Sequence, residues 1–183
     1  MALSDDLERI ATAAVVYAAP GERVAGILAA EPLSAGRVYL CAYESEDEHG
    51  WLALDDDARP VTGRALVREV ASLAALCELA EETAGGGDLP ALRARLAELR
   101  ETEAPEGIEE AEEAAAALER ALRAAPRVAT SGYLDELGAA SRRLERALGE
   151  DARSPFAGAL QQSAAAVEEL AADVERHYKG PLD

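Results

Sequence analysis

The chain has 183 residues, which is enough for one domain or two small ones. It has 36 Asp and Glu residues against 18 Lys and Arg, and the resulting formal charge of −18 excludes nucleic-acid binding through phosphate neutralisation. Hydrophobic residues make up 49% of the chain, but many are alanines, which gain little from each burial. We therefore expect several helices in mutual contact, with self-association as a homo-oligomer through alanine-rich helices or an exposed sheet face.

The compartment is predicted from what the sequence lacks. No uninterrupted apolar run approaches the roughly 18 residues that a membrane span needs. The first ten residues, MALSDDLERI, are acidic where a secretion signal is basic. The two cysteines, Cys41 and Cys77, are too few for a disulfide framework and lie in apolar segments. We expect a cytoplasmic protein with buried, reduced thiols; the alternative is a redox pair, if a helix brings the two together.

The first third of the chain predicts a helix followed by three strands. Ser4 caps a helix that Pro20-Gly21 ends, and its expected buried face is Leu7, Ile10, Ala14 and Val15. The expected strands are 23–30, 37–44 and 51–55, and the short turns between them favour antiparallel pairing. Both faces of the middle strand are apolar, which predicts cover on both sides. A brief fourth strand is expected at Val61.

The segment 62–84 is the helix around which the rest is organised. It carries a wide apolar stripe, which predicts contact with more than one neighbour. Thr62 is its expected cap, and Gly85-Gly86-Gly87 ends it as either a tight turn or a hinge. Four further helical patterns follow. Breaks at Ala104-Pro105, Pro126, Gly149 and Ser154-Pro155 separate them.

These patterns predict an α+β fold. Residues 1–84 form an N-terminal α-β-β-β-α unit with a small antiparallel sheet. Residues 88–183 form a C-terminal antiparallel helical bundle, packed on the shared helix 62–84.

Two acidic turns and two histidines are candidate sites of metal binding or acid–base chemistry. His49 stands beside Glu44, Glu46, Asp47 and Glu48, while the other acidic turn is Asp55–Asp57. The two turns flank one strand and should lie over about 10 Å apart, at opposite sheet ends, so they cannot share one cation. His177 is expected near a helix C-terminus, which stabilises its cationic form. We interpret the turns as solvated hairpins and expect no bound cofactor or metal.

The helix carboxylates Glu109, Glu110 and Glu113 give an E-E-x-x-E pattern. It resembles, over five residues, the magnesium-binding pattern of all-α nucleotide pyrophosphatases of the MazG and dimeric dUTPase type. That resemblance implies a second helix with E-x-x-D, whereas Glu169 and Asp173 are one residue too far apart. A solvated glutamate face is the alternative.

The aromatic residues gather in the first third of the chain. Tyr39 and Tyr43 share a strand face, and Trp51 lies on the next strand, with His49 at the rim of this region. The cluster is interpreted as core, a protein interface or a small-molecule pocket.

We find no phosphate loop, nucleophile elbow or zinc-ligand spacing in the sequence. The function expected is therefore a non-enzymatic acidic interaction or scaffold module that binds a protein partner or itself, but neither nucleic acid nor membrane. The alternative is a small-molecule- or metal-binding domain, enzymatic or not, that uses Tyr39, Tyr43, Trp51 and His49, and the third candidate is the nucleotide pyrophosphatase.

Overall fold

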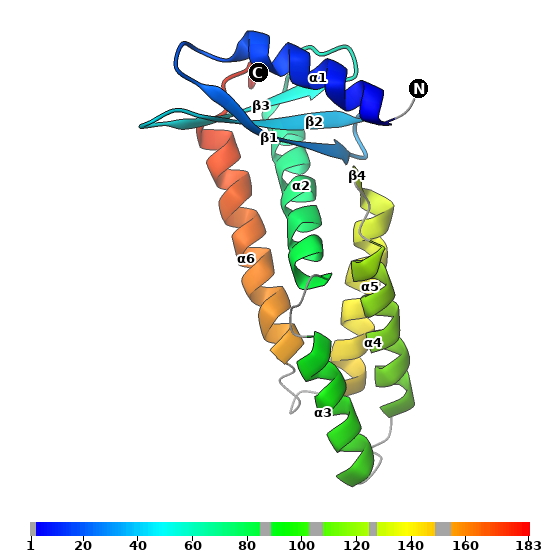
Figure 1. The fold of residues 1–183 in the computed structure, drawn as a ribbon. Coiled ribbons are helices and arrows are strands. Elements are labelled where there is room, and N and C mark those ends of the chain that lie inside the picture. The colour runs from blue at the N-terminus through cyan, green and yellow to red at the C-terminus, as the bar shows by residue number, and fades with distance from the viewer. Residues whose placement is uncertain (1–2, 85–88, 103–107, 125–127, 149–154) are drawn as a thin grey trace. The chain divides into compact units, whose positions relative to one another are not determined.

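A computed structural model describes residues 3–84, 89–102, 108–124, 128–148 and 155–183. The chain forms two compact units, neither of which is continuous in sequence (Figure 1). Unit 1 contains residues 1–75, 127–131 and 167–183, and unit 2 contains residues 76–126 and 132–166. The elements in chain order are α1 (Leu3–Tyr17), β1 (Arg23–Glu31), β2 (Val38–Glu44), β3 (His49–Asp55), α2 (Arg64–Ala84), α3 (Leu89–Thr102), α4 (Ile108–Arg123), β4 (Val128–Thr130), α5 (Ser131–Leu148) and α6 (Pro155–Arg176).

The α+β class and the α-β-β-β-α order of the first part are confirmed. The sheet has the strand order β3-β2-β1-β4, and the first three strands pair antiparallel. The sheet is mixed rather than purely antiparallel, because the short β4 pairs parallel with the end of β1. The sequence analysis did not find β4, since three residues are too few for a periodic pattern. At the expected fourth strand, the Val61 amide donates to the Ala53 carbonyl at 2.8 Å.

Helix α1 covers one face of the sheet (Figure 1). Ile10 and Ala14 are fully buried there against alternate residues of β2 and β3. Val15 was expected on this buried face, but its side chain is 65% exposed. An α-helix turns 100° per residue, so Val15 points away from the stripe that its neighbour Ala14 occupies. The core residues of this face are Ile10, Ala14, Ala29, Tyr39, Cys41, Tyr43, Leu52 and Leu54.

The opposite sheet face is also buried, as the apolar pattern on both sides of β2 predicts. Val38 and Leu40 are at most 2% exposed. Helix α2 begins on the side of the sheet away from α1 (Figure 1), with Val67 and Val70 fully buried. It starts at Arg64 rather than at Thr62, and the Gly63 carbonyl accepts the first helical hydrogen bond, from Val67. Its residues up to 75 belong to unit 1 and the later ones to unit 2.

Tyr39 and Tyr43 offer a matched pair of substitutions in this core. Both rings are fully buried, but the Tyr43 hydroxyl donates to the Ala14 carbonyl at 2.8 Å, whereas the Tyr39 hydroxyl has the Arg37 guanidinium nearby and makes no hydrogen bond of good geometry with a described residue. Tyr43→Phe should therefore lower the free energy of unfolding by about 1–2 kcal/mol, and Tyr39→Phe by less than about 0.5 kcal/mol. Urea unfolding followed by circular dichroism measures both, and equal costs would contradict this assignment.

Burial of Cys41 makes the free energy of unfolding fall at alkaline pH. The apolar surroundings raise the pKa of its thiol to about 12, from 9.0. The folded state therefore holds this proton more tightly than the unfolded chain does. Its contribution to stability is complete below pH 9 and is lost as the pH rises toward 12. We expect a lower free energy of unfolding at about pH 10.5 than at pH 8, with a smaller drop in Cys41→Ala. An unchanged drop in that variant would contradict the assignment.

Unit 2 has its own core, built largely from α4 and α5. Leu118 and three alanines of α4 are buried in one cluster with Leu137 and Leu144 of α5. Helix α3 packs on α4, and two ion pairs join these helices, Arg93–Glu119 at 2.5 Å and Arg100–Glu112 at 3.2 Å. The buried residues of this core are Leu96, Ile108, Ala111, Ala114, Ala115, Leu118, Leu122, Tyr133, Leu137, Ala140 and Leu144.

Several expected helix ends fall outside the described residues, namely Gly85–Gly87, Ala104-Pro105, Pro126, Gly149 and Ser154. Among the described helices, none is both long enough and apolar enough to cross a membrane.

Candidate metal centre

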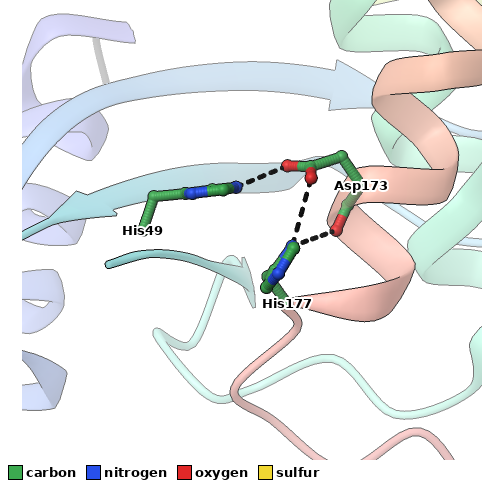
Figure 2. Close-up of side chains that lie close together, drawn as sticks. All are labelled: His49, Asp173 and His177. Carbon is green, nitrogen blue, oxygen red and sulfur yellow. Dashed lines mark hydrogen bonds and ion pairs between the residues drawn. The ribbon is translucent and has the colours of Figure 1, made fainter. Parts of the chain in front are cut away.

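Three side chains of unit 1 lie close together, one from β3, one from α6 and one from the residue after α6 (Figure 2). The Nε2 atom of His49 lies 2.8 Å from Oδ2 of Asp173, and Nδ1 of His177 lies 3.1 Å from Oδ1 of the same carboxylate. The centroids of the two imidazole rings lie 4.5 Å apart, and the ring planes are tilted by 50°. One potential ligand atom from each residue lies within 4.8 Å of the other two. We call this group the His49–Asp173–His177 cluster.

The β2–β3 hairpin places His49. A turn closed by the Ser45 amide, which donates to the Glu48 carbonyl at 2.8 Å, sets His49 opposite Glu44 at the start of β3. Side chains alternate along a strand, so His49 and Trp51 point to the same side. That side is the one away from α1, because Leu52 and Leu54 belong to the core that α1 covers.

The last turn of α6 supplies Asp173, and His177 directly follows the last residue of that helix. Asp173 and His177 are four residues apart, so their side chains lie on the same side of the chain, one turn from each other. In unit 1 this end of α6 is tied to the start of α2 by ion pairs. Arg64 lies 3.1 Å from Glu175, and Arg68 lies 2.6 Å from Glu168. Each of these surface pairs contributes at most about 1 kcal/mol, and both join the part of α6 that carries Asp173 to α2.

Trp51 is the fourth member of the arrangement. Its indole Nε1 donates to Oδ2 of Asp173 at 3.1 Å, beside the contact from His49. Such a hydrogen bond to a ligating carboxylate fixes its orientation and is a common feature of the outer shell of metal sites. Burial of Asp173 favours its protonated form, but the hydrogen bonds from Trp51 and His49 and the two nearby histidines outweigh this. The pKa of the Asp173 carboxyl is therefore lowered, and the group is a carboxylate at neutral pH.

Two imidazoles and one carboxylate form a donor set suited to first-row transition metals. Imidazole nitrogen binds zinc, copper, nickel and iron, whereas magnesium and calcium prefer sites made of oxygen alone. The histidine side chains are 50% and 41% exposed, and the aspartate 24%. A metal held here by three protein ligands would thus keep coordination positions open to water. A metal would replace hydrogen bonds to Asp173, because each coordinating histidine nitrogen must then offer a lone pair and carry the ring proton on the other nitrogen.

The residues predicted from the aromatic pattern divide into two groups. His49 and Trp51 belong to the cluster and its surroundings, on one side of β3. Tyr39 and Tyr43 lie in the core under α1, and the Lys179 ammonium sits 4.2 Å above the Tyr43 ring. The four residues do not converge on one site.

The predicted helix carboxylates lie on α4 of unit 2. Glu109 and Glu110 are exposed, and Glu113 lies 3.9 Å from Arg143. Within the described ranges, the His49–Asp173–His177 cluster is the only group of three such side chains close enough to share an ion.

Sequence reasoning placed His49 and His177 apart and gave Asp173 no role with either. Each half of the cluster has a local sequence pattern, H-x-W on a strand and D-x-x-x-H near a helix end. Each pattern puts two polar side chains on one side of its element. Neither signal reveals that the helix end meets the start of β3, since 124 residues separate His49 from Asp173.

Comparisons with known proteins add no assignment, because no family model, curated protein or solved structure matches this chain.

Proposed function

We propose that this is a metal-binding protein that holds one first-row transition cation at the His49–Asp173–His177 cluster. The observation that carries the proposal is the convergence of two imidazole nitrogens and one carboxylate within 4.8 Å of one another. An ionised carboxylate, oriented by the Trp51 indole, supports it. The cation joins the start of β3 to the end of α6.

Zinc is the first cation to test, because it accepts this mixture of nitrogen and oxygen ligands without demanding a particular geometry. Calorimetric titration of the untagged protein with zinc chloride at pH 7.5 should give one site per chain. Magnesium and calcium should give no heat, since two of the three ligands are imidazoles. Because Trp51 is the only tryptophan and touches the cluster, zinc should also shift its fluorescence.

The matched variants are His49→Ala and Glu48→Gln. The first removes a ligand, and the second removes an exposed carboxylate from the neighbouring position of the same hairpin. His49→Ala should lose zinc binding, while Glu48→Gln should bind as the wild type does. A flat titration of the wild type, or undiminished binding by His49→Ala, would refute the proposal.

A second function, self-association, is favoured by the open edge of β1. Strand β4 pairs only with Ala29–Glu31, so the strand edge from Arg23 to Leu28 has β2 on one side and no strand on the other within the described residues. Val15 and Val16, at the end of α1 from which the chain turns into β1, are 65% and 80% exposed. A second copy could pair antiparallel along this edge, with the same surface used by both chains.

Light scattering tests this second proposal directly. The wild type should give a mass about twice 19.2 kDa at micromolar concentration. Val16→Glu should return it to a monomer, because it buries a charge in the expected contact. Leu33→Glu is the control, since Leu33 is as exposed, at 84%, but lies in the β1–β2 turn. A wild-type monomer would exclude self-association.

A further inference from the structure

Residues 178–183 follow α6 and His177, and their first part pairs with β3. The Trp51 amide donates to the His177 carbonyl at 3.0 Å, and the Lys179 amide donates to the Trp51 carbonyl at 2.8 Å. These two bonds make a single parallel bridge between Trp51 and Tyr178. Further on, the Arg64 amide donates to the Leu182 carbonyl at 2.7 Å. We call residues 178–183 the C-terminal strap.

Side chains of the strap hold it at two further points. The Tyr178 hydroxyl donates to the Val61 carbonyl at 2.7 Å, and the ring packs against the core under α1. The Lys179 ammonium pairs with Glu22 and lies over the Tyr43 ring. Gly50 makes room for this crossing, because a Cβ at that position would come within 3.0 Å of the Lys179 side chain.

The strap begins at a proposed metal ligand. The His177 carbonyl accepts the first strap hydrogen bond, while its ring belongs to the cluster. On β3, His49 stands two residues from Trp51, whose backbone makes both bonds of the bridge. A cation held by His49 and His177 would therefore clamp the two backbones where their pairing starts. The bridge itself has only two hydrogen bonds, so a cation beside it adds one more link to the anchors at Tyr178, Lys179 and Leu182.

We infer that metal binding fastens the C-terminal strap to β3, so that release of the metal makes opening of the strap, and exposure of the Trp51 edge of the sheet, more frequent. This inference rests on the proposed metal site. Because a ligand that binds only the closed state stabilises it by mass action, opening becomes rarer by the factor 1 + [metal]/Kd. The coupling is reciprocal, so a loosened strap must weaken metal binding.

Amide hydrogen exchange measured by NMR on the untagged full chain tests the inference. With free zinc at a hundred times its Kd, exchange of the Trp51 and Lys179 amides should slow by up to about a hundredfold relative to the EDTA-treated protein. Amides of α4, in unit 2, serve as the internal reference. His49→Ala should show the fast exchange with and without zinc.

Tyr178→Ala supplies the reciprocal measurement, since it removes a strap anchor and no ligand. It should bind zinc several-fold more weakly than the wild type, while Glu48→Gln should not. Zinc binding that leaves the exchange rates of the Trp51 and Lys179 amides unchanged would contradict the inference about the strap but not the proposed metal site. A Tyr178→Ala variant with the zinc affinity of the wild type would do the same. Failure of the wild type to bind zinc would overturn both.

Discussion

Asp173→Asn should weaken zinc binding at least about a hundredfold. Loss of a residue that merely supports a ligand costs about 10–100-fold in metal affinity, and Asp173 is itself the only anionic ligand of the three. It also lies between the two histidines, 2.8 Å from one and 3.1 Å from the other. The amide of asparagine keeps the shape and an acceptor for the Trp51 indole, so the variant should fold. Calorimetry with zinc measures the loss.

Glu169→Gln is the control for that variant. It removes an exposed carboxylate one helical turn before Asp173, on the same element and in the same unit. Its zinc affinity should equal that of the wild type. If both variants lose the same affinity, the cause is the general negative charge of the protein and not a ligand set.

Leu118→Ala should lower the free energy of unfolding by about 3–5 kcal/mol. Leu118 is fully buried in the core of unit 2, where many of its neighbours are alanines. Alanine has no side-chain rotamers with which to fill a vacated space, so the cavity persists and its full cost is felt. Urea unfolding, followed by the helical circular dichroism signal, measures the change.

Leu99→Ala is the comparison for that measurement. Leu99 packs against the same core but is only partly buried, so the same truncation should cost clearly less. Equal costs at the two positions would contradict the assignment of Leu118 to the centre of the core.

The fold was largely predictable because its signals are local. The apolar runs of β1–β3, bounded by segments of turn composition, and the wide apolar stripe of α2 each predict an element from a short stretch of sequence. Val15 was misplaced because helix position was inferred from apolarity, and an exposed valine looks the same in sequence as a buried one. Strand β4 was missed because its only support is parallel pairing with β1, a long-range interaction.

The candidate site was only half predictable. His49 and Trp51 were singled out from one stretch of sequence, together with Tyr39 and Tyr43, which lie in the core. Asp173 and His177 can be recognised as candidate ligands only once the end of α6 is known to lie beside the start of β3. A set of ligands drawn from both ends of a chain leaves no fixed spacing for a motif to record.

The discontinuous make-up of unit 1 has a consequence during protein synthesis. His49 is synthesised well before Asp173, since the two are 124 positions apart in the sequence. At typical elongation rates this interval lasts roughly 6–25 s. During this interval the β2–β3 hairpin has been synthesised, but Asp173, His177 and the C-terminal strap have not. Cation binding is thus a late event in synthesis, because the site is incomplete until His177 has been added.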